Sequence, residues 1–100
     1  MLPAIDPLSF PDAAFIGDVL VVDVRGRNLD AVESVQVKPA RGVRAMLGDP
    51  LTRRDSPVHA GPDRLTVTVQ IDFDAYPGDR RLWVQSPTGD SNPLILTVML

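Results

Sequence analysis

The sequence predicts an all-β domain built as an antiparallel sandwich, and three observations support this fold class. Between residues 64 and 73, apolar and polar side chains alternate strictly, which produces a strand with one buried face and one solvated face. Ten prolines and seven glycines are spread along the chain with short apolar runs between them, as in antiparallel sandwiches. No stretch shows the 3.6-residue periodicity of an amphipathic helix.

The N-terminal half is expected to supply the first strands. Prolines interrupt residues 1–15, which suits a short edge strand followed by a meander. The apolar side chains of this segment are expected to lie over one end of the sandwich: Leu2, Ile5, Leu8, Phe10 and Phe15. Residues 18–25 form the next strand, one face of which consists of Leu20, Val22 and Val24. A turn at 26–30 leads to a third strand, marked by Val32, Val35 and Val37 and ended by Pro39.

The C-terminal half carries the clearest strand pattern. Residues 41–47 are expected to form a short strand, and residues 48–63 a long surface loop of the kind that is usually functional or mobile. The alternating strand that follows has an apolar face of Leu65, Val67, Val69, Ile71 and Phe73. A corner at 74–78 and a turn at 87–90 frame two further strands, at 80–86 and 94–98. We therefore expect one domain, residues 1–100, with about seven strands.

Composition and charge argue against several classes of function. The net charge of −3 and the pI near 4.8 provide no general attraction for a phosphate backbone, so no nucleic-acid partner is expected. The chain has no cysteine, which excludes disulfides and thiolate metal sites and favours assembly in a reducing cytoplasm. The N-terminus lacks the basic and apolar regions of a signal peptide, and no apolar run is long enough to insert into a membrane.

Catalytic and metal-binding patterns are weak. His59 is the only histidine and no G-x-S-x-G elbow is present, so neither a nucleophilic triad nor a histidine metal cluster is expected. The acids around the predicted corner supply oxygen ligands of the kind calcium takes, but their spacing does not match an EF-hand loop: Asp72, Asp74 and Asp79. No phosphate-binding or dinucleotide glycine pattern appears. We expect no enzyme activity, no cofactor and no metal site.

Two segments carry a family resemblance. Residues 17–29 read GDVLVVDVRGRNL, and residues 74–94 read DAYPGDRRLWVQSPTGDSNPL. In order and spacing these segments are similar to the opening and closing motifs of IPT/TIG domains, the immunoglobulin-like fold shared by plexins and transcription factors. The resemblance covers roughly residues 3 to 98, and the loop at 48–63 is longer than the family usually carries. It implies an immunoglobulin-like sandwich used for structure and recognition, with no common catalytic residues.

Two surface patches are the candidate partner sites. The first is basic and combines Arg53 and Arg54 with the upstream Arg41 and Arg44. It would suit an acidic partner, but a solvated loop with internal ion pairs is the favoured explanation. The second follows from the family pattern, in which Leu82 and Val84 point inward. The outward positions of the last two strands then bring together Trp83, Ile95 and Met99. The alternative is that the N-terminal segment, with Phe10 and Phe15, covers Trp83.

These observations favour a non-enzymatic structural or interaction protein. The leading hypothesis is a phage virion component, such as a capsid decoration protein, assembled in the bacterial cytoplasm and bound to a shell protein through a sheet face and loops. A homo-oligomer is compatible with this hypothesis. The alternative is a ligand- or carbohydrate-binding domain of a bacterial surface protein or enzyme, in which Trp83 and Tyr76 would stack on sugars.

Overall fold

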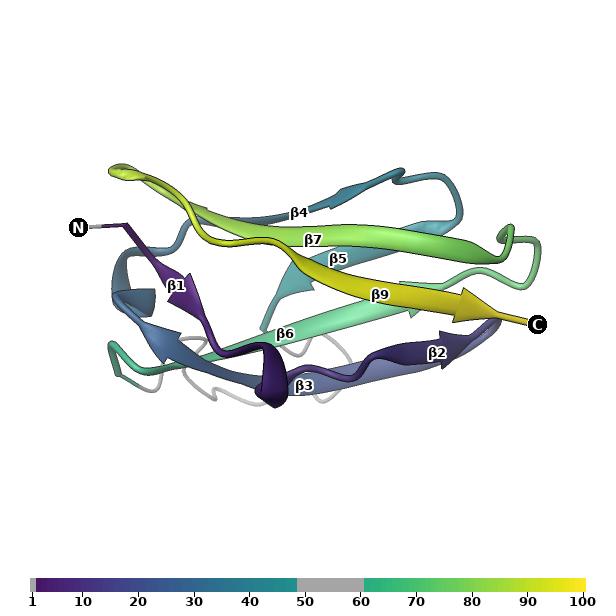
Figure 1. Ribbon diagram of the computed structural model, residues 1–100, viewed down its shortest axis with the longest axis horizontal. Coiled ribbons are helices and arrows are strands. Elements are labelled where there is room, and N and C mark those ends of the chain that lie inside the picture. Colours follow the sequence, from purple (N-terminus) through teal and green to yellow (C-terminus); the bar gives the residue numbers. More distant parts are fainter. Residues whose placement is uncertain (1, 49–60) are drawn as a thin grey trace.

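The structure is a computed structural model that describes residues 2–48 and 61–100, and these residues form two packed β-sheets (Figure 1). The first sheet has the order β1 (Ala4–Ile5), β3 (Val19–Arg27), β6 (Arg64–Ile71), β5 (Val43–Leu47). The second has the order β2 (Ala13–Phe15), β9 (Leu94–Met99), β7 (Gly78–Ser86), β4 (Ser34–Lys38), with β8 (Gly89–Asp90) paired to β7. The predicted all-β sandwich is confirmed. Two of these described strands contain only two residues, so the prediction of about seven fits those that remain.

The described helical segments are short 3-10 turns, η1 (Pro7–Ser9) and η2 (Leu29–Ala31). Asn28 precedes η2 in the left-handed region at φ 56°, a conformation that asparagine tolerates better than most residues. Within the described part of the chain, no helix has the length and apolar character needed to cross a membrane. Most of the predicted surface loop at 48–63, including His59, lies outside the described residues.

One strand pairing differs from the antiparallel prediction. The strands β3, β6 and β5 pair antiparallel, as do β4, β7 and β9. However, β2 runs parallel to β9, with Phe15 beside Met99. The N-terminal segment therefore joins both sheets, because β1 pairs with β3 before the chain crosses over to β9.

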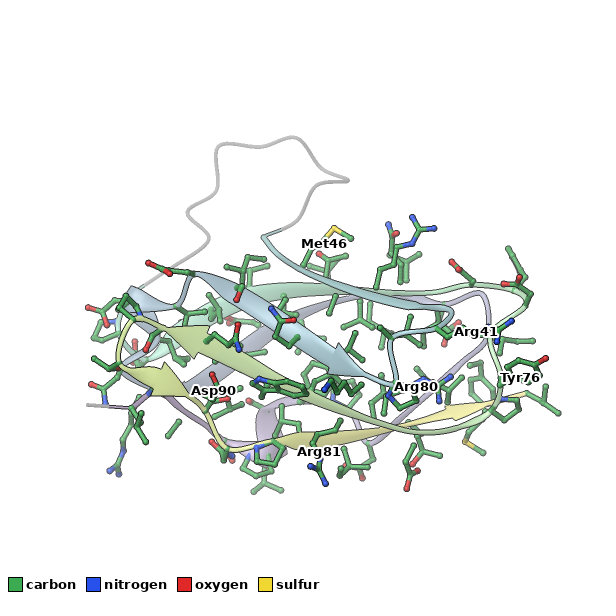
Figure 2. The ribbon with its side chains drawn as sticks, turned by 90° about the horizontal axis from the view of Figure 1, so that it is seen from above. Arg41, Met46, Tyr76, Arg80, Arg81 and Asp90 are labelled. Carbon is green, nitrogen blue, oxygen red and sulfur yellow. The ribbon has the colours of Figure 1, made fainter. Side chains whose placement is uncertain are left out.

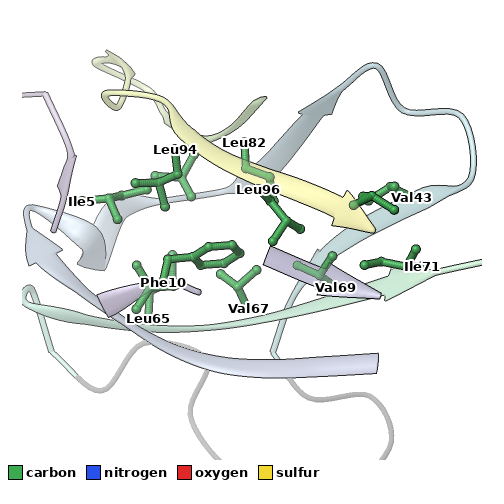
Figure 3. Packing of buried hydrophobic residues seen from close by; sticks show 14 of the residues in the cluster. Ile5, Phe10, Val43, Leu65, Val67, Val69, Ile71, Leu82, Leu94 and Leu96 are labelled. Atoms are coloured by element: carbon green, nitrogen blue, oxygen red, sulfur yellow. The ribbon is translucent and has the colours of Figure 1, made fainter. Parts of the chain in front are cut away.

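The core lies between the two sheets and is built by the alternation seen in the sequence. The inward side chains of β6 are all buried: Leu65, Val67, Val69 and Ile71. The second sheet faces them with the buried side chains of β7 and β9, namely Leu82, Val84, Leu94, Leu96 and Val98. Phe10, in the segment after η1, fills the space between these layers (Figure 3). Burial of this apolar surface is the main stabilising contribution to the fold.

Several predicted positions in the apolar pattern are wrong. Phe73 was expected to continue the buried face of β6, but it is 84% exposed because the strand ends at Ile71. The chain turns there, and the Ala75 amide donates to the Asp72 carbonyl at 3.1 Å. Of the apolar side chains expected to cover the end of the sandwich, Ile5 and Phe10 are buried, whereas three are exposed: Leu2, Leu8 and Phe15.

Asn92 fastens the N-terminal strand to the second sheet. Its side-chain oxygen accepts from the Ile5 amide at 2.7 Å, and its side-chain nitrogen donates to the Ile5 carbonyl at 2.9 Å. The neighbouring Ser91 hydroxyl accepts from the Val84 amide at 3.0 Å. The adjacent Ser91 and Asn92 therefore have a structural role: each accepts a hydrogen bond from a strand amide.

Candidate binding site on the second sheet

The outward face of the second sheet combines an aromatic ring with polar and charged side chains. On β7 this face includes Arg81, Trp83 and Gln85, as the alternation predicts. Strand register places Trp83 opposite Gln36 of β4. It places Arg81 between Lys38 of β4 and Ile95 of β9. Because directly opposed side chains have Cβ atoms about 4.5–5.5 Å apart, these residues form one continuous surface.

A groove of about 530 Å³ runs over this surface, and we call it the Trp83 groove. Its walls come from the end of β4 and from β7 and β9: Lys38, Pro39, Asp79, Arg80, Arg81, Trp83 and Ile95. A second groove of about 290 Å³ also uses Ile95 and extends toward Asp12 and Pro93. The two grooves therefore share Ile95 as a wall.

Trp83 is half-buried and held against the sheet by one edge of its ring. The indole Nε1 is buried and has no hydrogen-bond partner among the described residues. Since Nε1 is the only polar atom of this side chain, the part of the ring that remains exposed consists of carbon atoms. The exposed part of the ring is therefore apolar.

A small hydrogen-bonded network borders the indole. The Ser34 hydroxyl donates to the Gln85 side-chain oxygen at 3.1 Å. The Gln36 side-chain nitrogen donates to the same oxygen at 3.3 Å and to the Ser34 hydroxyl at 3.3 Å. Part of the capacity of these groups remains available, because an amide carries two donors and an acceptor oxygen with two lone pairs. A ring platform beside amide and hydroxyl groups suits a ligand with both C–H and O–H groups.

A buried guanidinium lies at one end of this site. Arg80 points to the inner side of the sheet, in phase with Leu82, and is only 4% exposed. Its Nη2 donates to the Tyr76 carbonyl at 2.8 Å and to the Arg41 carbonyl at 3.5 Å. The Arg41 guanidinium lies 5.7 Å from the centre of the Tyr76 ring. Figure 2 shows Arg41 and Tyr76 at one end of the sandwich and Asp90 toward the other.

The structure brings together only part of the predicted patch. Trp83 and Ile95 line the same groove, and Ile95 is 51% exposed. Met99 is 43% exposed but lies four residues further along β9, which is roughly 13 Å away from Ile95. Its neighbour across the strand pair is Phe15. Met99 therefore does not line the groove that Trp83 and Ile95 share, and the patch of Trp83, Ile95 and Met99 stays a prediction.

Other predicted positions fall elsewhere. Phe10 is buried between the sheets and Phe15 lies beside Met99, so these two rings do not cover the outward side of Trp83. Tyr76 is 66% exposed but belongs to the corner before β7, outside the Trp83 groove. Arg53 and Arg54 lie outside the described residues.

The acids of the corner do not form a metal site among the residues that the structure describes, where no group of three His, Cys, Asp or Glu side chains is placed to hold an ion. Asp72 and Asp74 do not share a strand face, because β6 ends at Ile71. Asp79 instead accepts a hydrogen bond from the Thr97 hydroxyl at 2.7 Å.

Sequence reasoning missed Lys38 and Gln36, because it left open which strand borders the other side of β7. It also missed the burial of Arg80. The spacing of Arg80 from Leu82 and Val84 was the available signal, since residues two apart share a strand face.

Comparison with known proteins supports the fold. No family model matches the chain, so the IPT/TIG resemblance stays a prediction, and no curated protein matches it. Among solved structures, the chain resembles SGBP-B of a Bacteroides ovatus mixed-linkage glucan utilization locus, determined in complex with a mixed-linkage heptasaccharide. The TM-score is 0.50 at 18% sequence identity, over 97% of this chain and 22% of that one. This chain therefore spans about a fifth of the length of the protein that it resembles.

Proposed function

We propose that this chain is a non-catalytic carbohydrate-binding domain that holds a polysaccharide on the outward face of its second sheet. The observation that carries the proposal is Trp83, whose exposed ring surface is apolar and lies beside the amides of Gln36 and Gln85. The apolar face of a sugar ring packs its C–H groups on such an aromatic surface, while its hydroxyls exchange hydrogen bonds with the amides. A bacterial cell-surface location fits this function.

Two further features support the proposal. The Trp83 groove and a second groove lie on either side of Ile95, which suits a chain of several sugar units better than a single small molecule. The protein of similar fold was determined with a heptasaccharide, which makes glycans the first ligand class to test. Because the match covers only 22% of that protein, the glycan-binding role of this chain depends on its own groove.

The test is a binding measurement on the wild type and on Trp83→Ala, using affinity electrophoresis in gels that contain neutral and acidic polysaccharides. We expect the wild type to be retarded by at least one polymer. Trp83→Ala should weaken that interaction about 10- to 100-fold, or about 1.4–2.8 kcal/mol, since it removes the stacking surface.

The control variant is Phe73→Ala, which removes an aromatic ring that is 84% exposed and lies outside the Trp83 groove. It should bind like the wild type. Trp83→Phe, which keeps an aromatic surface, should retain most of the affinity and shows whether loss of binding comes from misfolding. Wild-type protein that ignores every polysaccharide would overturn the proposal, as would equal binding by Trp83→Ala.

A protein-binding role is the second candidate, and the predicted capsid decoration protein is its most specific form. It draws on a different observation, the exposed pair Phe15 and Met99, which stand side by side on β2 and β9. Exposed apolar neighbours of this kind are common at protein interfaces. Light scattering during size-exclusion chromatography, alone and with a shell protein, separates the two candidates. A complex or oligomer that is lost in Met99→Asp supports the protein-binding role. A monomer that does not bind the shell protein opposes this role.

A further inference from the structure

The Trp83 groove is positively charged within an acidic chain. Lys38 and Arg81 stand directly opposite each other on β4 and β7, and both are exposed. Like charges in such a pair repel and destabilise the strand pairing unless a counter-charge lies nearby. Among the described residues, neither side chain has an ion-pair partner. The exposed end of the groove is therefore short of negative charge.

Arg80 adds to this potential from within the fold. Arg80 is 4% exposed, and its guanidinium is a cation. Its described partners are two backbone carbonyls, and its Nε has none. A buried charge is weakly screened, so its field extends to the groove that the residue helps to line.

Among the described residues that line the groove, one carboxylate opposes these three cations. Asp79 lines it, and one of its oxygens accepts from the Thr97 hydroxyl. The groove therefore has a net positive charge, while the whole chain has a net charge of −3. A local reversal of charge at a candidate site favours a ligand of the opposite charge.

We infer that the Trp83 groove selects acidic polysaccharides, whose sugar carboxylates lie between Lys38 and Arg81; this inference rests on the proposed carbohydrate-binding function. A carboxylate there neutralises the opposed pair, and the Arg81 guanidinium accommodates it with two parallel N–H···O bonds. The adjacent sugar ring packs on Trp83, two residues along the same strand face. A polymer of uronic acids supplies both groups in every unit.

The other sheet provides a matched control. Arg25 and Arg64 are also directly opposed, on β3 and β6, and line a groove of about 580 Å³. That groove contains no aromatic side chain, and two acids line it, Asp6 and Asp63. The double variants Lys38→Gln with Arg81→Gln, and Arg25→Gln with Arg64→Gln, therefore remove the same charge from the two faces of the molecule.

The experiment measures binding of polygalacturonate, alginate and neutral mixed-linkage β-glucan to the wild type and both double variants by affinity electrophoresis and calorimetry. We expect the wild type to bind at least one uronate polymer ten or more times more tightly than the glucan. The Lys38/Arg81 variant should lose this preference, because its binding of uronate polymers weakens about tenfold. The Arg25/Arg64 variant should keep the preference. Dextran sulfate reports on binding by charge alone, and it should compete weakly.

The outcomes separate the inference from the function on which it rests. Glucan binding without a uronate preference overturns the inference and leaves the carbohydrate-binding function intact. A preference that survives in the Lys38/Arg81 variant, or is lost equally in both double variants, also overturns the inference. If dextran sulfate binds as tightly as the uronate polymers, the inference is also overturned, because the preference then depends on charge alone. Failure of the wild type to bind any polysaccharide overturns both.

Discussion

At the scale of single residues, a few polar side chains hold chain segments together that the apolar pattern does not connect. Asn92 replaces a missing strand partner, because its amide exchanges both a donor and an acceptor with the backbone of Ile5. Arg80 joins two chain segments at one end of the sandwich through the carbonyls of Arg41 and Tyr76. Both residues act through hydrogen bonds of fixed geometry. Substitutions that change their side-chain length or hydrogen-bonding groups should therefore lower the stability of the domain more than substitutions that change only polarity.

The Asn92→Ala variant tests this view. It leaves the amide and carbonyl of Ile5 without their partners in a partly buried position, so we expect a loss of about 2 kcal/mol in the free energy of unfolding. For a domain of this size the melting temperature should fall by about 8–16 °C. Differential scanning calorimetry measures this shift. The exposed Glu33→Ala variant should change stability by less than about 0.5 kcal/mol. A similar small effect of Asn92→Ala would show that β1 is held by other contacts.

At the scale of strands, the alternation of apolar and polar residues predicts which face of a strand is buried, but not which strands pair with one another. The buried faces of β6, β7 and β9 follow from period-two spacing, and most of these residues are where the sequence places them. Strand ends were less predictable, since Phe73 continues the alternation in the sequence although the chain turns after Ile71. The parallel pairing of β2 with β9 has no local signal, because Ala13–Phe15 is too short to specify a partner.

The same distinction explains how much of the site was predictable. Trp83 and Ile95 were assigned to the outward face from spacing alone, and they do line one groove. Met99 lies on the same face of β9 as Ile95 but further along the strand. Only the strand register shows that its neighbour is Phe15 of β2 and not a residue of the groove. Lys38 became part of the site through its pairing with Arg81, which depends on the order of strands in the sheet. The positions of Met99 and Lys38 relative to the groove therefore depend on how the strands are arranged in the sheet, which the local sequence does not specify.

Gly26 gives a prediction at this scale. A Cβ atom at this position would lie 1.9 Å from the Ala4 carbonyl oxygen, so any side chain there must displace β1. We expect Gly26→Ala to destabilise the domain by about 2 kcal/mol, as for other overpacked sites. Hydrogen exchange should become faster at the amides of Ile5 and Asp6, which are held by Asn92 and by the Arg25 carbonyl.

The neighbouring Arg27→Ala is the control, since this residue is exposed and lies on the same strand. It should leave both stability and exchange nearly unchanged. Unaltered exchange in Gly26→Ala would mean that β1 can move aside without losing its hydrogen bonds.

At the scale of the whole molecule, the two sheets differ in what they present to solvent. The second sheet carries the only tryptophan of the chain, a pair of opposed cations and a groove that joins them. The first sheet carries an opposed pair of arginines without an aromatic residue. The proposed carbohydrate-binding function depends on this difference. It places the ligand on one face of the sandwich, whereas the fold alone allows many roles.

The single tryptophan permits the most direct test. In a ¹⁵N–¹H correlation spectrum the Trp83 indole gives one isolated signal, and we would titrate the protein with an oligogalacturonide and with a mixed-linkage gluco-oligosaccharide. We expect the indole signal to shift on binding, together with the amides of Arg81, Gln36 and Ile95, while those of β3 stay in place. Binding that leaves the indole signal unmoved, or no shift with either sugar, would contradict the proposed function.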